Sequence, residues 1–280
     1  MKYFFKENGR RGANAGPVRN QAALAPITLV SMTSPAILVR DLKKFYGSKA
    51  AVNGVDLEVP RGSFFGFLGP NGAGKSTTIR ILTGLIPADS GYLEILGMRP
   101  EESELEIKRR IGLVPDESLL FDRLTGAEFL EFVGRMYGLD RPVAIERARD
   151  LLELLELAND RKLIGEYSKG MRKRVALAAS LIHHPELFLM DEPFEGVDAV
   201  GARLMKDILL GQVRRGATVF LTSHVLEVVE RLCDHIAIIN HGTIVTSGAL
   251  EELRAGGESL EDAFVRVVGA ERQLEHLDWL

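Results

Sequence analysis

The chain has 280 residues, of which 46% are apolar, so it can bury a sizeable core as one domain or as one domain with a subdomain. Its single cysteine, Cys233, excludes a disulfide framework and a multi-cysteine metal site, suits a reducing compartment, and is expected to be a buried apolar residue. The net charge is −4, but residues 1–34 carry +4, which leaves −8 on the rest. Such an acidic body argues against a nucleic-acid partner.

Residues 1–35 are predicted to form a flexible N-terminal extension. The apolar stretch "AALAPITLVSM" lies far from the N-terminus and is interrupted by Pro26 and Thr28, unlike the core of a secretory signal. The alternative is a start site placed too early, with Met32 as the true one. No apolar run in the sequence approaches the ~20 residues needed to span a bilayer, so we expect any membrane link to run through a partner.

Organised sequence begins near residue 36. Short apolar stretches at 36–42, 55–60 and 91–97 predict strands of a small antiparallel β portion near 36–65 and 91–98. A further apolar strand, "FFGFL" at 64–68, runs into a glycine-rich turn. The following "KSTTIRILTGL" has helical spacing, with Ile79, Leu82 and Leu85 on one face.

From about 116 to 182 the pattern predicts a helical subdomain. Thr125 and Glu128 match a capping box, and Pro142 suits the first turn of a leucine-rich helix that we expect to pack in the core rather than in a coiled coil. Apolar strands return at 187–190, 217–222 and 235–240, and indicate a buried parallel sheet. Residues 251–280 are predicted to be a helical tail.

Residues 69–77, "GPNGAGKST", fit the phosphate-binding pattern G-x-x-x-x-G-K-[ST] between a predicted strand and a predicted helix. Glycines let backbone N–H groups turn toward phosphate oxygens. Lys75 brings a cation to the β- and γ-phosphates, and the Ser76 hydroxyl can bind Mg²⁺. The predicted phosphate-binding residues are Gly69, Pro70, Asn71, Gly72, Ala73, Gly74, Lys75, Ser76 and Thr77.

Two further strands end in polar residues that suit the same reaction. Asp191 and Glu192 follow the apolar "LFLM", and His224 follows "VFLT". Strand tips of an open α/β sheet face the ligand crevice. We therefore expect Asp191 to hold Mg²⁺, Glu192 to position or deprotonate the attacking water, and His224 to contact the γ-phosphate. The other histidines, His183 among them, are expected to have surface or packing roles.

A second possible anion site opens with "EYSKGMRKRVALAA" at residues 166–179. Ser168 suits the N-cap of an amphipathic helix, and Gly170 lets the backbone approach a ligand closely. The free N–H groups of a helix start favour an anion. The sequence thus contains two candidate phosphate sites about a hundred residues apart.

Taken together, these motifs resemble those of the nucleotide-binding subunit of ATP-binding-cassette (ABC) transporters, over roughly residues 36–250. "YSKGM" at 167–171 occupies the place of that family's L-S-G-G-Q signature, where Ser168 and Gly170 match and Tyr167, Lys169 and Met171 differ. The resemblance implies an α/β fold with a RecA-like P-loop NTPase core, a small antiparallel β subdomain and a helical subdomain. It also implies head-to-tail dimers, in which Ser168, Lys169 and Gly170 face the partner's ATP.

The resemblance assigns three more positions. Tyr46 in "KKFYG" matches an aromatic residue that stacks on adenine, Asp198 in "EGVD" matches the aspartate of a loop at the dimer interface, and His224 matches a switch histidine. Asp116 stands where the family usually has a glutamine that contacts Mg²⁺ or the lytic water. An aspartate keeps an oxygen ligand, so we expect Asp116 to contact the metal, although it lacks the amide donor.

The function implied is Mg²⁺-dependent ATP hydrolysis that powers a separate integral-membrane permease. The chain is expected to form a dimer with a second ATPase subunit, most simply a homodimer, at the cytoplasmic face of the cell membrane. "SLEDAFVRVVG" near the C-terminus resembles bacterial efflux-type subunits and favours an exporter. One alternative is a soluble cassette ATPase with an assembly or mechanical role. A P-loop small-molecule kinase would leave "YSKGM", "EGVD" and His224 unexplained.

Overall fold

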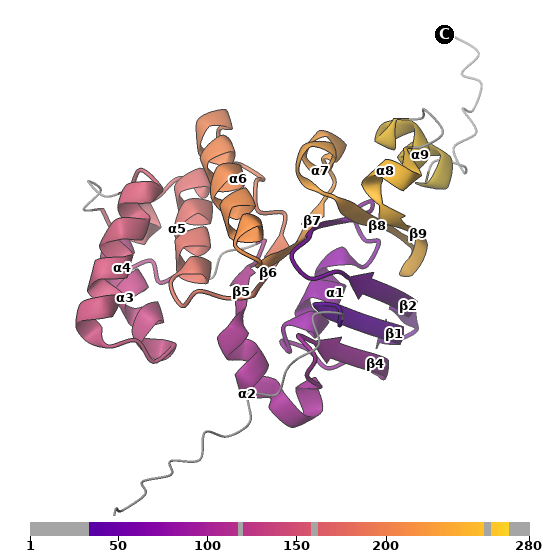
Figure 1. Cartoon of the computed structure of the whole chain (residues 1–280), viewed down its shortest axis with the longest axis horizontal. Helices are drawn as coiled ribbons and strands as arrows, with labels where there is room; N and C mark the ends of the chain where they lie inside the picture. The colour runs from indigo at the N-terminus through magenta and orange to yellow at the C-terminus, as the bar shows by residue number, and fades with distance from the viewer. Residues whose placement is uncertain (1–33, 117–119, 158–161, 255–258, 269–280) are drawn as a thin grey trace, which may run out of the picture. The chain divides into compact units, whose positions relative to one another are not determined.

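A computed structural model describes residues 34–116, 120–157, 162–254 and 259–268 (Figure 1). Strands and helices alternate along most of the chain, as the α/β prediction requires. The elements in chain order are β1 (Ile37–Tyr46), β2 (Lys49–Val59), β3 (Phe64–Leu68), α1 (Lys75–Leu82), β4 (Ser90–Ile95), α2 (Pro100–Arg110), β5 (Ile111–Val114), α3 (Gly126–Met136), α4 (Arg141–Leu154), the 3₁₀ turn η1 (Ile164–Glu166), α5 (Lys169–Leu181), β6 (Leu187–Asp191), α6 (Ala199–Arg214), β7 (Thr218–Ser223), α7 (Leu226–Leu232), β8 (His235–Asn240), β9 (Thr243–Ala249), α8 (Leu250–Leu253) and α9 (Leu260–Val268).

The larger sheet has six strands in the order β5-β6-β7-β3-β8-β9. The pairings from β5 to β8 are parallel, which confirms the predicted buried parallel sheet. β9 pairs antiparallel with β8 and was not predicted. A tight turn permits this return, because His241 and Gly242 both have positive φ. The carboxyl ends of β3, β6 and β7 therefore lie side by side at one edge.

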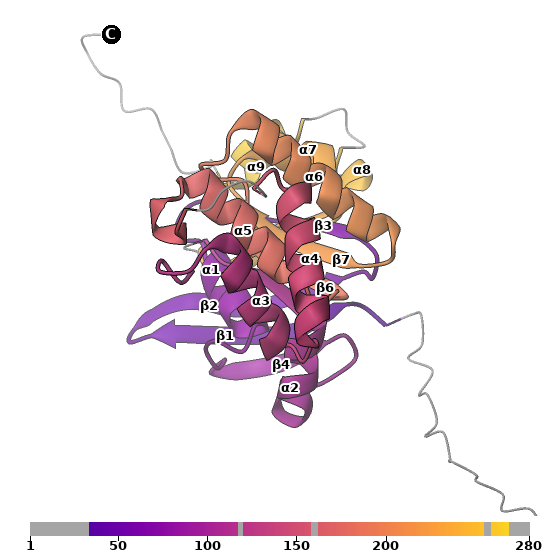
Figure 2. The same ribbon diagram turned by 90° about the vertical axis from the view of Figure 1, so that its left-hand side faces the viewer.

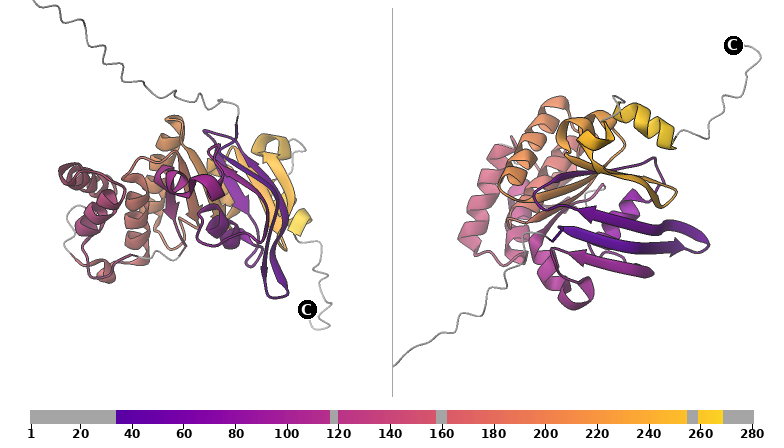
Figure 3. Two further views of the ribbon diagram at one scale, coloured as in Figure 1. Left: turned by 90° about the horizontal axis from the view of Figure 1, so that it is seen from below. Right: turned by 45° about the vertical axis from the view of Figure 1, so that its right-hand side comes forward.

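The smaller sheet is antiparallel, in the order β2-β1-β4, and is drawn as a separate layer in the right-hand view of Figure 3. Its inner side chains share one core with α1 and β3; Ile37, Phe67 and Ile79 are buried there. The predicted apolar face of the helix is wrong at its last position, Leu85, which is 61% exposed. The helix ends at Leu82, because Gly84 adopts φ +69°.

The helical part lies on the other side of the large sheet, where α3 and α4 run beside each other in Figure 2. The predicted capping box is confirmed: the Thr125 hydroxyl accepts a hydrogen bond from the Glu128 N–H (3.3 Å), and the Glu128 carboxylate accepts one from the Thr125 N–H (2.9 Å). Leu152 and Leu155 are buried in the main core, as expected of core packing rather than of a coiled coil.

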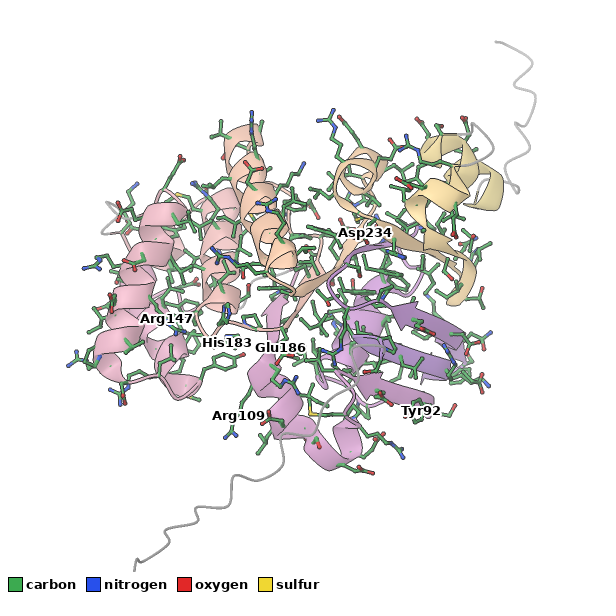
Figure 4. All side chains as sticks on the ribbon, in the orientation of Figure 1. Tyr92, Arg109, Arg147, His183, Glu186 and Asp234 are labelled. Carbon is green, nitrogen blue, oxygen red and sulfur yellow. The ribbon has the colours of Figure 1, made fainter. Side chains whose placement is uncertain are left out.

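His183 joins the helical part to the sheet. Its ring stacks on Tyr137, with centroids 3.6 Å apart, and its Nε2 lies 2.9 Å from the carbonyl oxygen of Ile111. Arg147 donates a hydrogen bond to the neighbouring carbonyl of Ile182 (2.7 Å; Figure 4). Burial lowers the pKa of His183. The residue therefore has the packing role expected of it.

The predicted terminal segments lie largely outside the described residues. The extension at 1–35 is described only from residue 34, and the tail at 251–280 only through α8, α9 and the residues next to them. Both stay predictions. Cys233 is buried, as expected. Among the described residues, no helix has the length and apolar character that a bilayer crossing requires.

Candidate active site

The glycine-rich motif at 69–77 connects β3 to α1, and backbone hydrogen bonds hold its loop in place. The Ala73 N–H donates to the Pro70 carbonyl (3.1 Å), and the Gly242 N–H donates to the Ala73 carbonyl (2.9 Å). Gly74 has φ +114°, and a Cβ there would lie 2.4 Å from the carbonyl oxygen of Ala51, so only glycine fits. The first N–H groups of α1 have no carbonyl in the helix to donate to and are free for an anion.

Lys75 lies at the start of α1 with its side chain only 7% exposed. Its ammonium group donates to the carbonyl oxygens of Gly69 (2.7 Å) and Pro70 (3.3 Å) and lies 3.8 Å from Glu192 Oε1. Burial lowers the pKa of Lys75, and the carboxylates of Glu192 and Asp191 oppose that shift. The loop therefore holds its cation inside the curve of its own backbone.

The end of β6 is held by the end of β7. Asp191 is buried, and its Oδ1 accepts a hydrogen bond from the Thr222 hydroxyl (2.6 Å). The same hydroxyl oxygen accepts a hydrogen bond from the Glu192 N–H (3.0 Å). Parallel pairing of β6 with β7 places Asp191 opposite Thr222, which sets this arrangement. One Asp191 oxygen is thereby oriented, and the other remains available to a cation.

Glu192 directs its carboxylate toward two basic groups. Its Oε1 lies 3.0 Å from His224 Nδ1 and 3.8 Å from Lys75 Nζ, and its side chain is 13% exposed. His224 follows β7 and is about half exposed. A carboxylate in this position, close to a histidine and to the lysine of the glycine-rich loop, can accept a proton from water.

These groups line one cleft of about 550 Å³. The space beside Gly72 is open, and the lining offers N–H donors, a cation and the carboxylates of Asp116, Glu192 and Glu195, so the residues fit a nucleoside triphosphate with a divalent cation. The predicted site residues that line it are Tyr46, Asn71, Gly72, Gly74, Lys75, Ser76, Thr77, Asp116, Glu192 and His224. Gly69, Pro70 and Ala73 form the back of the loop, and Asp191 lies beneath Glu192.

Besides Gly69, Pro70, Ala73 and Asp191, four further predicted site residues do not line this cleft: Ser168, Lys169, Gly170 and Asp198. Ser168 is the N-cap of α5, and its hydroxyl accepts a hydrogen bond from the Met171 N–H (3.2 Å), as predicted. Asp198 caps α6 and accepts hydrogen bonds from the N–H groups of Val200 (3.1 Å) and Gly201 (2.9 Å), which lower its pKa. Both residues are exposed at helix starts.

The signature turn, residues 167–171, packs against the loop at 195–198. A Cβ on Gly170 would lie 3.2 Å from the Gly196 carbonyl oxygen, and the stem of Lys169 covers Gly196. Lys169 Nζ donates a hydrogen bond to Glu195 (2.7 Å), which raises the pKa of Lys169 and lowers that of Glu195. Within one chain, the two interface motifs of the sequence therefore form one surface.

Asp116 lies at the rim of the cleft with its side chain 46% exposed. Its Oδ1 is 3.5 Å from Nζ of Lys173, a buried residue of α5. Lys173 and Thr222 were not predicted as site residues, nor were Lys49, Ala51 and Glu195 of the cleft lining. Only Thr222 had a usable signal, because it follows an apolar run at the end of a strand next to the Asp191 strand.

Three comparisons with known proteins bear on this site. The sequence pattern of the family described as "ABC transporter" matches residues 52–195. The chain is 41% identical over 225 residues to the linearmycin resistance ATP-binding protein LnrL of Bacillus subtilis, covering 79% of this chain and 72% of that protein. It is 40% identical over 241 residues to the daunorubicin resistance ATP-binding protein DrrA3 of Streptomyces coeruleorubidus, covering 85% and 76%. A dimeric ATP-binding cassette solved in a post-hydrolysis state with ADP and Pi superposes with TM-score 0.70 and 25% identity, covering 76% of this chain and 98% of that one.

Proposed function

Because this chain belongs to the ABC transporter family and hydrolyses ATP as one of its ATP-binding subunits, we propose that it works as a head-to-tail dimer that powers a separate membrane permease, and that the permease is an exporter. The observation that carries this proposal is the split of the site. One chain gathers the phosphate loop, Glu192 and His224 around a cleft, but leaves Ser168 and Asp198 on a surface outside it.

The residues of the cleft divide the reaction among them. The N–H groups at the start of α1 and the Lys75 ammonium bind the phosphates, and Tyr46, half exposed at the end of β1, stacks on the base. Ser76, Asp191 and Asp116 would hold Mg²⁺, which neutralises phosphate charge when bound. Glu192 accepts a proton from the attacking water, and His224 orients the Glu192 carboxylate and the γ-phosphate.

The second chain supplies what the first lacks. The free N–H groups at the start of α5, with the dipole of a helix that runs from Lys169 to Leu181, favour the γ-phosphate of a partner's ATP. Lys169 adds a cation there. The solved cassette that superposes on this chain is dimeric in its printed description, which supports this arrangement. ATP would thus join two chains, and hydrolysis would release them.

An exposed apolar patch suits the permease. Phe121, Phe132 and Met136 are 51%, 42% and 71% exposed, and the rings of Phe121 and Phe132 are 5.4 Å apart. Phe132 and Met136 are four residues apart on α3 and so share one face. An apolar patch of this kind marks a protein interface. We propose that this patch docks the permease and holds the chain at the inner face of the membrane.

Membrane recovery tests this proposal. We expect the chain to fractionate with membranes when it is co-expressed with the permease encoded beside its gene, and to stay in the supernatant without it. Met136→Glu should remove the membrane fraction while leaving MgATP hydrolysis of the purified chain within a few-fold. The matched control is Val245→Glu, an exposed apolar residue on β9 (45%), which should change neither. A chain that stays in the supernatant both with and without permease would favour a soluble assembly or mechanical role.

The direction of transport rests on the relatives, two of which are named for resistance to linearmycin and to daunorubicin. Cells that express the chain with its permease should therefore grow at higher concentrations of an antibiotic than cells with the Glu192→Gln variant. A panel that includes linearmycin and daunorubicin gives the readout. Accumulation of a labelled compound that rises with active protein would instead indicate import.

A further inference from the structure

Lys173 is a buried lysine that the proposed mechanism does not use. It lies on α5, one turn after the signature turn, and its side chain is 2% exposed. Lysine is rarely buried to this extent without partners, because its charge loses the solvation of water. Burial lowers the pKa of Lys173, and Asp116 opposes that shift. The groups around its ammonium must therefore compensate for the lost solvation.

Those groups come from two segments of the nucleotide site. Lys173 Nζ donates to the carbonyl oxygen of Glu192 (3.1 Å) and to that of Pro115 (3.3 Å), and it lies 3.5 Å from the carbonyl oxygen of Asp191. Its ion pair with Asp116 Oδ1 also measures 3.5 Å. One cation thus joins the end of β6, the turn at 115–116 and the signature helix.

Glu192 needs such support, because its backbone has φ +46°. This left-handed conformation is uncommon for a residue with a side chain and persists only where the surroundings hold it. Side chains bind both backbone groups of Glu192: its N–H donates to the Thr222 hydroxyl, and its carbonyl accepts from Lys173 (3.1 Å) as well as from the Glu195 N–H (3.3 Å). The left-handed backbone is the one from which the carboxylate lies beside His224 and Lys75.

We propose that Lys173 is a positioning residue for Glu192. Its ammonium holds the Glu192 carbonyl, and so keeps the backbone in the conformation that directs the carboxylate toward His224. Because the same ammonium pairs with Asp116 and belongs to the signature helix, movement of either segment alters the position of Glu192. The inference rests on the proposed role of Glu192 in hydrolysis.

The test replaces Lys173 with a neutral side chain of similar length. For Lys173→Met we expect kcat for ATP to fall at least ~10-fold, because a misplaced catalytic group loses part of its ~10²–10⁴-fold contribution, whereas KM and the affinity for a fluorescent ATP analogue change little. Lys173→Gln keeps an N–H donor and should retain an intermediate kcat. Lys108→Met, which removes an exposed lysine paired with Glu104, should match the unmodified chain.

Two double variants distinguish a role of Lys173 that acts through Glu192 from an effect of the Asp116 charge left without its cation. In Glu192→Gln, adding Lys173→Met should lower the residual rate no further, because both changes act through one group. Adding Asp116→Asn to Lys173→Met removes the carboxylate left without its cation; if that restored kcat fully, the uncompensated Asp116 charge would be the cause and the inference would be wrong. An unchanged kcat in Lys173→Met would also overturn it.

The variants at 173 and 192 show whether the role of Lys173 or the proposed function is wrong. If Glu192→Gln is inactive and Lys173→Met is normal, only the role of Lys173 is lost. If Glu192→Gln keeps turnover, the role of Glu192 itself fails. The urea midpoint of each variant is measured alongside, and Lys173→Gln carries the test if Lys173→Met does not fold.

Discussion

The phosphate-loop half of the site and the signature turn differ in how far their polar side chains are buried and bonded within a single chain. In the first half, Lys75, Asp191 and Glu192 are mostly buried and bonded to one another or to neighbouring strands. In the second, Ser168 and Lys169 are exposed; the Ser168 hydroxyl caps the start of α5, and Lys169 pairs with Glu195. The first half is built like an enzyme cleft and the second like an interface.

The difference has a physical cause. Parallel strands carry their terminal residues to one edge, so β3, β6 and β7 gather the catalytic groups without a partner. The signature turn starts a helix in a separate layer, and the first N–H groups of that helix have no carbonyl in the helix to donate to. A hydrolytic site divided between two chains, as we propose for this protein, would make catalysis depend on association.

The largest expected effect comes from Glu192, the proposed catalytic base. Glu192→Gln should lower MgATP turnover at least ~10²-fold, because the amide cannot accept the proton of the attacking water. Affinity for ATP should persist, since the phosphate loop is intact. The matched control is Glu195→Gln, which changes a second carboxylate in the lining of the same cleft but one bonded to Lys169. Steady-state hydrolysis and analogue binding check both. Equal losses in the two variants would mean that the cleft needs negative charge rather than a base at residue 192.

The next effect tests the division of the site between chains. Lys75→Ala and Ser168→Arg should each be nearly inactive as a homodimer, because every composite site then lacks one half. Mixed at equal amounts, they form heterodimers with one intact site and one doubly altered site, so part of the activity should return. Hydrolysis by the mixture, compared with each variant alone, is the measurement. A mixture as inactive as its components would show that both halves act within one chain.

Much of the first half was predictable from sequence, because its signals are local. The phosphate loop is a contiguous motif between an apolar strand and a helix, and Asp191 and Glu192 directly follow a strand whose five residues are all buried. The capping box at Thr125 is equally local. The predictions about residue roles in both halves, those of Ser168 and Asp198 included, stay predictions.

Contacts between distant segments were not predictable. Lys173 stands among Arg172 and Arg174 in a basic run, and nothing in that run marks it as the buried member that reaches Glu192. The antiparallel strand β9 was missed because its residues alternate between exposed and half-buried positions without a strong apolar pattern. Leu85 was misplaced because the periodicity continues past the glycine that ends α1.

The hydrogen bonds of Thr222 to Asp191 and Glu192 also predict that a change at residue 222 lowers the free energy of unfolding. Thr222→Val leaves Asp191 Oδ1 and the Glu192 N–H without their shared partner, and each buried polar group so abandoned costs about 1–3 kcal/mol. We expect the free energy of unfolding, measured in urea without nucleotide, to fall by that order. Thr78→Val is the control, because the buried Thr78 hydroxyl donates only to the Gly74 carbonyl, which already accepts the Thr78 N–H. A similar fall in the free energy of unfolding in both variants would mean that any buried threonine hydroxyl contributes as much, and that the bonds to Asp191 and Glu192 add nothing.

The smallest effect concerns Asp116, which lies where the two halves meet. Its carboxylate lines the cleft and also pairs with Lys173 of the signature helix. A carboxylate near Mg²⁺ favours its ionised form and attracts the cation, whereas the glutamine of Asp116→Gln offers only a neutral carbonyl oxygen. We therefore expect Asp116→Gln to need a few-fold more Mg²⁺ for half-maximal hydrolysis, with nucleotide affinity nearly unchanged.

Asp116→Ala should go further, because it removes the oxygen ligand and the partner of Lys173 together. Turnover and its stimulation by the permease should then fall in parallel, since one turn serves both the metal and the signature helix. The deciding measurement is a Mg²⁺ titration of hydrolysis for the unmodified chain and both variants, with and without permease. If the three curves superimpose, Asp116 is only a turn residue, and its ion pair with Lys173 does not affect hydrolysis.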